Sequence, residues 1–250
     1  MDRLNKKTTP LIICIFGFVC FAAVCMILKI SPARLTGAAF CHQIPSRSPG
    51  ANYPFCYRCS GLFSGISAGI ITTRLWEEKR RLYTIPDILF FAFSFLFFII
   101  DILNSSKFSG IHFYNESVNI RFLSAFPLGF FLARIILQII NYLFSINNLC
   151  LIKNIPEKIL TFTISLGLFY YLVFSNNNSL KMISEILLTT GCIIFLALLY
   201  TILCSCFSML KNRQINKSSA FFAGLALAFF HITAAGGIHI RFLRFERFFS

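Results

Sequence analysis

Charged side chains are scarce in this sequence. They make up 13% of the 250 residues, whereas a water-soluble domain usually carries about a quarter. The chain also has no Gly-rich nucleotide loop, no serine-nucleophile elbow and no His-Glu-x-x-His motif, so it lacks those signatures of nucleotide-binding proteins, serine hydrolases and zinc proteases. Instead, 57% of the residues are hydrophobic and 32 are Phe. This composition predicts that the protein has a lipid bilayer as its solvent.

Basic residues exceed acidic ones, and the formal net charge is +14. Lys and Arg cluster at the ends of apolar runs, where they set topology and meet anionic lipid headgroups. We therefore expect the lipid bilayer as a partner and no nucleic-acid partner.

Seven apolar stretches have or approach the length of about 20 residues that a spanning helix needs. They predict an all-α, polytopic transmembrane bundle of about seven spans, forming one integral domain over residues 1–250 of a cytoplasmic (inner) membrane protein. Residues 30–135 form its motif-bearing half, and residues 145–250 add further spans. The first stretch is too long for a usual signal-peptide core, so we expect a retained helix. The stretches are Leu11–Leu28, Ser60–Leu75, Asp87–Leu103, Phe122–Phe144, Ile159–Phe174, Ile183–Phe207 and Ser219–Ile238.

Three of the ten cysteines are grouped in one polar segment: Cys41, Cys56 and Cys59. Six others lie within apolar runs, where a free cysteine behaves as a small hydrophobe. Cys56 and Cys59 have the Cys-x-x-Cys spacing at which two thiolates can bind one metal ion or form one reactive disulfide. His42 lies beside Cys41 as a further candidate ligand or proton carrier. This loop is the most informative segment of the sequence.

Three interpretations of the loop remain open. Three thiolates and one nitrogen are a usual zinc ligand set, although neighbouring Cys41 and His42 are poorly placed to bind the same ion. Alternatively, Cys56 and Cys59 cycle between thiols and a disulfide, with Cys41 as the resolving thiol and a membrane quinone as electron acceptor. Arg58 and the helix start after Cys59 would favour thiolate in that case. Thirdly, a disulfide or a closed zinc site has a structural role only.

Chain parity places further polar residues at the membrane face of the cysteine loop. The loop joins the first two predicted spans, and Asp101 lies at the far end of the third. The loop joining the third and fourth spans contains His112, Glu116, Asn119 and Arg121. Because helices reverse direction at each crossing, all these groups belong to one face, whichever face that is. We expect a shared polar site there, including an Asp101–Arg121 pair. The positive-inside rule favours an inside amino terminus only weakly, so the side stays open.

Glycines follow the cysteine pair at every fourth residue: Gly61, Gly65 and Gly69. On a helix they form a stripe that allows another backbone to approach closely. Such packing would hold the cysteine pair rigidly. In the fourth predicted span, Arg134 needs a partner or a wet cavity, because a central Arg costs about 2.5–3.5 kcal/mol on insertion scales. We expect His231 to be a hydrogen-bonded core histidine.

The cysteine loop resembles a known family. Its pattern Cys-His-Gln-x-Pro-x-Arg-Ser, followed by Cys-x-Arg-Cys-x-Gly, resembles an uncharacterised prokaryotic membrane-protein family, domain of unknown function 2085. Asp101 and Arg121 look like a second motif, in which Ser124 and Ala125 depart from the family's Thr and Gly and Gly129 matches. The resemblance covers roughly residues 30–135. It implies a membrane protein with a shared polar site and no particular reaction. The first motif matches at Cys41, His42, Gln43, Pro45, Arg47, Ser48, Cys56, Arg58, Cys59 and Gly61.

The sequence therefore predicts a Cys/His site at one membrane face that binds a metal ion, zinc or another transition metal. Cys41, His42, Cys56 and Cys59 are the metal or redox candidates. The alternatives are a thiol–disulfide oxidoreductase coupled to quinone, a small-solute transporter with Arg134 and Asp101 near its path, and a structural cysteine site. Whether the protein is an enzyme, and its substrate, stay open. The supporting charges and hydrogen bonds would come from Gln43, Arg47, Arg58, Asp101, Asn119 and Arg121.

Overall fold

Helices form all the regular secondary structure in the residues that the computed structural model describes, namely 2–41, 54–75, 85–105, 114, 117–144, 155–210 and 216–249. The prediction of an all-α fold is confirmed. Each of the seven predicted spans falls within one of the helices, apart from Phe144, one residue past the end of α5. The remaining helix, α2, is short and was not expected. The helices are α1 (Asp2–Leu28), α2 (Pro32–Phe40), α3 (Tyr57–Leu75), α4 (Ile85–Ser105), α5 (Val118–Leu143), α6 (Ile155–Phe174), α7 (Asn178–Leu210) and α8 (Lys217–Phe249).

Four of the described helices contain segments long and apolar enough to cross a membrane: Leu11–Leu28, Val118–Leu143, Asn178–Met209 and Lys217–Ile240. Two shorter apolar segments are Ile88–Asn104 and Ile159–Phe174. The exact number of seven spans stays a prediction. α3 is not among these segments because Gly, Ser and Thr dilute its apolar residues, yet much of it is buried. A helix enclosed by other helices does not need a lipid-facing apolar surface.

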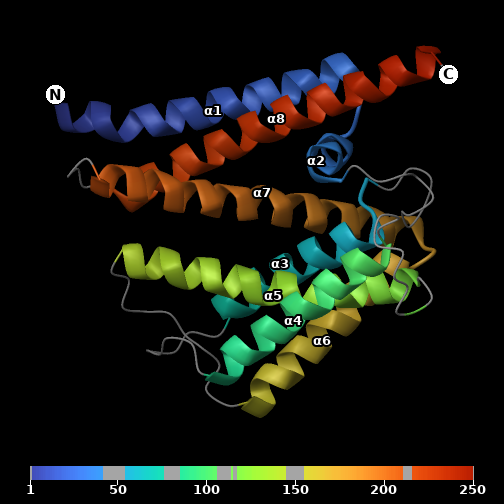
Figure 1. Ribbon diagram of the computed structural model, residues 1–250. Helices are drawn as coiled ribbons and strands as arrows, with labels where there is room; N and C mark the ends of the chain where they lie inside the picture. The colour runs from blue at the N-terminus through green and yellow to red at the C-terminus, as the bar shows by residue number, and fades with distance from the viewer. Residues whose placement is uncertain are drawn as a thin grey trace. The chain divides into compact units, whose positions relative to one another are not determined.

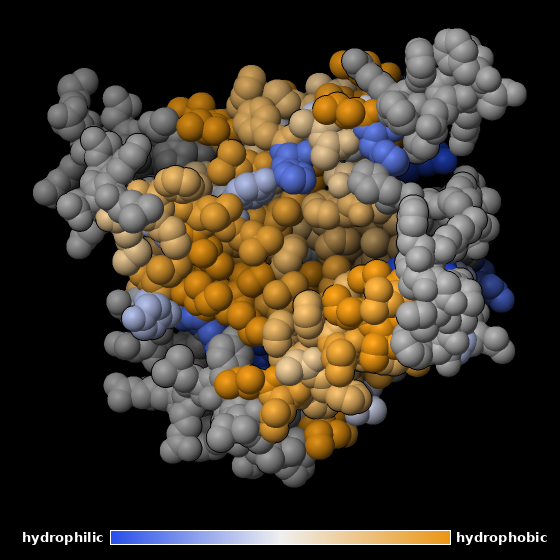
Figure 2. Space-filling view, in the orientation of Figure 1, coloured by the Kyte–Doolittle hydropathy of each residue, from blue (hydrophilic) through white to orange (hydrophobic). Residues whose placement is uncertain are grey.

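Apolar side chains cover much of the described surface, as Figure 2 shows in orange. Phe93, Ile12 and Leu89 are 69%, 63% and 63% exposed, and many other large aliphatic and aromatic side chains are similarly open. Water-soluble monomers rarely expose such continuous apolar patches. Lipid is the environment that accommodates them, so the protein is an integral membrane protein.

The helices form two compact units. The first contains α1, α2, α8, the end of α5 and the part of α7 from Cys192 onward. In this unit α1 and α8 lie side by side, and α2 packs on α8 (Figure 1). Leu35 of α2 and Phe229 and Ile232 of α8 belong to its apolar core. This division does not test whether the chain forms one integral membrane domain, which stays a prediction.

α1 and α8 run in the same direction. Gly17 faces Ala226, and further along both helices Val24 and Leu28 line one groove with Thr233 and Ile238. Two parallel spanning helices require an odd number of crossings between them. The five intervening helices α3 to α7 meet that requirement if each crosses the membrane once, as chain parity predicts.

The second unit contains α3, α4, α6, most of α5 and the part of α7 up to Gly191. Its apolar core is a stack of aromatic rings in which Phe122, Phe126 and Phe130 recur at every fourth residue of α5. Phe162 of α6 packs edge-on against Phe130, with ring centroids 5.3 Å apart. The side chain of Ser67 on α3 donates a hydrogen bond to the carbonyl of Leu187 on α7, over 3.2 Å. This unit carries most of the polar residues singled out above.

Candidate metal and thiol site

Cys56 caps the beginning of α3. Its carbonyl accepts the first helical hydrogen bond, from the N–H of Ser60 at 2.8 Å, and its Sγ accepts from the N–H of Cys59 at 3.4 Å. The sulfur thus takes the place of the side-chain oxygen that usually caps a helix. Because helix N-termini carry partial positive charge, this position stabilises negative charge on sulfur. Cys56 is 3% exposed, and neighbouring Phe55, which is fully buried, packs on Phe63 at 5.6 Å.

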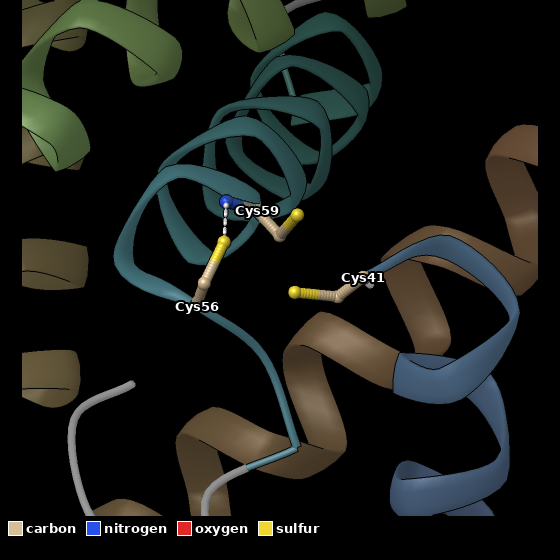
Figure 3. Close-up of side chains that lie close together, drawn as sticks. All are labelled: Cys41, Cys56 and Cys59. Atoms are coloured by element: carbon tan, nitrogen blue, oxygen red, sulfur yellow. Dashed lines mark hydrogen bonds between the residues drawn. The ribbon is translucent and has the colours of Figure 1, made fainter. Parts of the chain in front are cut away.

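The three thiols of Cys41, Cys56 and Cys59 all lie within 4.8 Å of one another (Figure 3). All three cysteines carry thiols and are not joined in disulfides. Cys41 ends α2, where its N–H donates to the carbonyl of Gly37 over 2.7 Å. In a tetrahedral zinc site with Zn–S bonds of about 2.3 Å, sulfur atoms are about 3.8 Å apart. Small side-chain rotations therefore suffice to bring the three sulfurs to metal-binding distances.

Glycines of α3 hold the cysteine pair against α5, as predicted. A Cβ atom added to Gly61 or Gly65 would overlap the backbone carbonyl of Phe122 or Phe126. A Cβ at Gly69 would meet the Cβ of Ala133 at 3.0 Å. The two backbones therefore touch along the stripe, and α3 cannot shift without separating from α5. This packing fixes the positions of Cys56 and Cys59.

A buried ion pair links the start of α3 to the end of α4. The guanidinium of Arg58 donates from Nε to Asp101 Oδ2 at 2.6 Å and from a terminal nitrogen to the Asp101 carbonyl at 3.1 Å. Asp101 is 1% exposed. The structure gives Asp101 a salt bridge to Arg58, which the sequence did not indicate, and the expected Asp101–Arg121 pair stays a prediction. Since Arg58 lies between the two cysteines in sequence, this pair ties the Cys-x-x-Cys turn to α4.

Tyr114 completes this network, and the sequence did not single it out. Its hydroxyl donates to Asp101 Oδ1 at 2.6 Å, while its backbone N–H donates to the side-chain oxygen of Asn104 at 3.2 Å. The Asn104 amide returns a bond to the Tyr114 carbonyl at 3.0 Å. Asn104 follows Asp101 by three residues and so shares its helix face. This spacing is the sequence signal that could have identified Asn104 as part of the network.

Burial and the neighbouring Asp101 carboxylate raise the pKa of the Tyr114 hydroxyl well above its usual value, against the opposing positive charges of Arg58 and Arg121. Arg121 is therefore near enough to this network for its charge to act on it. Its side chain is only 6% exposed. Asn119, two residues closer to the start of α5, is exposed and accepts a hydrogen bond from the Tyr170 hydroxyl on α6 at 3.0 Å. Arg58, Asp101 and Arg121 thus gather around Tyr114, and Asn119 has a partner on α6.

Three of the predicted site residues, His42, Gln43 and Arg47, lie outside the described residues. His112 and Glu116 lie outside them too. Their parts in the site stay predictions.

Two other polar residues at membrane depth are placed by the structure. Arg134 is buried, with its guanidinium 5.9 Å from the centre of the Phe130 ring. His231 is hydrogen-bonded as expected, since its Nδ1 lies 2.7 Å from the Tyr200 hydroxyl. It is exposed, however, so the expectation of a core position is wrong. Phe40 stacks on its ring at 6.0 Å. The Tyr200 hydroxyl gives the His231 ring a hydrogen-bond partner on the protein surface, so the histidine does not have to be buried to find one.

Residues 41–135 match the sequence profile of a family described as "Predicted membrane protein (DUF2085)". The match confirms the resemblance that the cysteine motif indicated. It spans Cys41, Cys56, Cys59 and the Arg58–Asp101–Tyr114 network. No curated protein and no solved structure matches the chain.

Proposed function

We propose that this multi-span membrane protein binds one transition-metal ion, most naturally zinc, through the thiolates of Cys41, Cys56 and Cys59. The observation that carries the proposal is the convergence of three cysteine sulfurs within 4.8 Å. Three sulfurs from a short polar segment are a donor set typical of zinc, and soft thiolates select against magnesium and calcium. A bound ion would neutralise part of the charge that three thiolates bring together.

The surroundings fit such an ion. The N-terminus of α3 and the Cys59 N–H both favour a Cys56 thiolate. Ser60, directly after Cys59, is fully buried, and among the described residues its hydroxyl has no hydrogen-bond partner. That hydroxyl is suited to hydrogen-bond a fourth ligand such as water. His42 is the other candidate for the fourth position or for carrying a proton. A water ligand would leave the exchangeable position typical of catalytic zinc sites.

Arg58, Asp101 and Arg121, with Gln43, Arg47 and Asn119, are proposed as supporting groups. Arg58 directly precedes Cys59 and carries a positive charge. Asp101 fixes the orientation of the Arg58 guanidinium through two hydrogen bonds. Charge near a thiolate centre tunes its basicity and its affinity for metal. Arg58 therefore acts as a positioning residue whose loss weakens metal binding without removing a ligand.

Thiol–disulfide chemistry is the second candidate, and the same proximity of the thiols favours it. Two of the three thiols would lose two electrons and two protons as an S–S bond forms, and a membrane quinone would accept both to become a quinol. The third thiol could then resolve the disulfide by exchange. The metal and redox candidates differ in what the isolated protein contains, namely bound metal with free thiols or a disulfide.

Metal analysis combined with thiol counting distinguishes the two candidates. The protein is purified without added metal or reductant, and metal content and reactive thiols are measured before and after reduction. The metal proposal predicts about one ion per chain, lost in Cys41→Ser, Cys56→Ser and Cys59→Ser. Cys206→Ser, at an exposed cysteine of α7, is the matched control and should retain it. A metal-free protein with a reducible disulfide among the three cysteines would overturn the metal proposal and support the redox one.

The membrane, the number of spans, the domain organisation and the transporter alternative also remain proposals. We place the protein in the cytoplasmic (inner) membrane with about seven spans in one integral domain. The transporter alternative rests on Arg134 and Asp101, both of which are buried. It predicts that replacing Arg134 changes solute uptake by cells that express the protein, and an unchanged uptake would remove that alternative.

A further inference from the structure

An apolar groove runs between the last turn of α1 and the part of α8 from Thr233 to Ile238. It has a volume of about 220 Å³. All but one of its lining residues are aliphatic or glycine, and the exception, Thr233, has its hydroxyl bonded to the Phe229 carbonyl at 2.7 Å. The lining residues are Val24, Ile27, Leu28, Thr233, Ala234, Gly237 and Ile238. The lining side chains therefore offer hydrocarbon contacts, and the one polar side chain among them already has a hydrogen-bond partner.

The groove lies where the apolar spans end. The candidate span of α1 stops at Leu28, and that of α8 stops at Ile240, two residues past the groove. Positive charge follows on both helices. Lys29 comes directly after Leu28, Arg241 directly after Ile240, and Arg244 and Arg247 extend the basic series. This is the depth at which lipid acyl chains meet headgroups.

α2 brings another cation to the same level. Leu35 of α2 packs against α8 at Gly236, where a Cβ would overlap the Leu35 carbonyl. Arg34, beside it, is exposed. Its backbone N–H is bonded to Ser31 Oγ at 3.2 Å, which fixes the first turn of α2. Lys29 is also exposed. Two exposed cations are thus next to residues at the groove: Lys29 follows the lining residue Leu28, and Arg34 precedes Leu35, which contacts α8 at Gly236.

Lys29 occupies a backbone conformation that favours glycine. Its φ is 53°, in the left-handed region, and it ends α1 with the two hydrogen bonds of a Schellman motif. The N–H of Ile30 donates to the Cys25 carbonyl at 3.0 Å, and the N–H of Lys29 donates to the Met26 carbonyl at 3.1 Å. Glycine is the usual residue at this position. A lysine in this conformation is less favourable than glycine. We therefore take its positive charge to be the reason for a lysine at this position.

We infer that this groove is a binding site for an anionic phospholipid, with one acyl chain along the groove and the phosphate-bearing headgroup between Lys29 and Arg34. The apolar lining suits the acyl chain, and the flanking cations suit the negative headgroup rather than a zwitterionic one. The groove and the thiol cluster share no residue, so the inference stands or falls independently of the proposed metal.

The groove can be filled without disturbing the helices. A Cβ at Gly237 has no heavy atom within 4 Å, so Gly237→Leu places its side chain in the open space of the groove. Gly167 on α6 is equally open, which makes Gly167→Leu the matched control. Lys29→Gly removes the charge and at the same time relieves the left-handed backbone.

Native mass spectrometry of the purified full chain, titrated separately with phosphatidylglycerol and phosphatidylcholine, tests the inference. The wild-type protein and Gly167→Leu should retain phosphatidylglycerol in preference to phosphatidylcholine. Lys29→Gly should lose about fivefold in phosphatidylglycerol affinity, the factor expected from one cation near a membrane surface. Gly237→Leu should lose at least as much. A thermal unfolding scan of each variant without added lipid shows that it is folded.

Two results would overturn the inference. One is equal retention of both lipids by the wild-type protein, which would mean that headgroup charge is not recognised. The other is a folded Gly237→Leu variant that retains phosphatidylglycerol like Gly167→Leu, which would mean that the acyl chain does not occupy the groove.

Discussion

Gly65→Ala is the substitution whose effect follows most directly from the packing around the thiols. A Cβ at Gly65 would stand 2.8 Å from the backbone nitrogen of Phe130, whereas ordinary contact begins at 3.4 Å. It would also overlap the backbone carbonyl of Phe126. Backbone atoms cannot rotate away as a side chain could, so α3 and α5 must separate locally by at least about half an ångström.

The expected cost of this separation is about 2–3 kcal/mol, the upper part of the range for overpacking, because the added atom meets backbone on two sides. For a chain of 250 residues this corresponds to a fall in unfolding temperature of about 4–12 °C. Cys56 and Cys59 begin the same helix, so their positions relative to Cys41 should loosen as well. We therefore expect Gly65→Ala to bind zinc more weakly than the wild-type protein.

Thermal unfolding in one detergent, with zinc affinity measured on the same samples, checks this prediction. Gly167→Ala is the control, because a Cβ there meets nothing within 4 Å. Both variants gain the same helix propensity, about 1 kcal/mol, so the difference between them reports the contact alone. Equal unfolding temperatures for the two variants would refute the backbone contact between α3 and α5.

Three further substitutions test separate parts of the account. Asp101→Asn should cost about 3 kcal/mol in the free energy of unfolding, because it leaves the Arg58 guanidinium without its buried counter-charge. In a double-mutant cycle with Arg58→Met, the double variant should be much less destabilised than the sum of the two single variants. Additive effects would contradict the ion pair. Tyr114→Phe should lower stability by about 1–2 kcal/mol through the lost bond to Asp101. Because the pKa of Tyr114 is raised from 10.0 in the folded protein, its neutral form contributes stability below pH 10 that is lost as pH rises further; the wild-type protein should lose stability above pH 10 more steeply than Tyr114→Phe, and parallel pH profiles would argue against the raised pKa. Lys29→Gly should leave the free energy of unfolding unchanged or increase it by about 1 kcal/mol, as measured by chemical denaturation, and a clear loss of stability would contradict the strain assigned to its φ of 53°.

Much of the helical framework could be predicted from the sequence, because apolar runs of spanning length have few alternatives in lipid. Chain parity also placed Arg58 and Asp101 at one face. It could not show that Arg58 pairs with Asp101, because such a pairing depends on how each helix is rotated about its axis. Side-chain packing sets the rotation, and the spacing of apolar residues in helices apolar on every side does not reveal it.

The spacing of Gly61, Gly65 and Gly69 did reveal one rotation, since the stripe had to face another backbone. Tyr114 was missed because it lies in a connection and is joined to Asp101 only through folding. The short helix α2 was missed although Ser31 and Pro32 form a regular helix start, with Ser31 Oγ as the cap. Nine residues are too few to stand out beside spans of twenty.

The central claim is that Cys41, Cys56 and Cys59 bind one metal ion together. X-ray absorption spectroscopy at the zinc edge, on protein purified with stoichiometric zinc, measures the ligands directly. The account predicts three sulfur scatterers at about 2.3 Å, with a single lighter atom as the fourth ligand, and two sulfurs in Cys41→Ser. A zinc ion surrounded by nitrogen and oxygen alone, or a sulfur count that Cys41→Ser leaves unchanged, would contradict it.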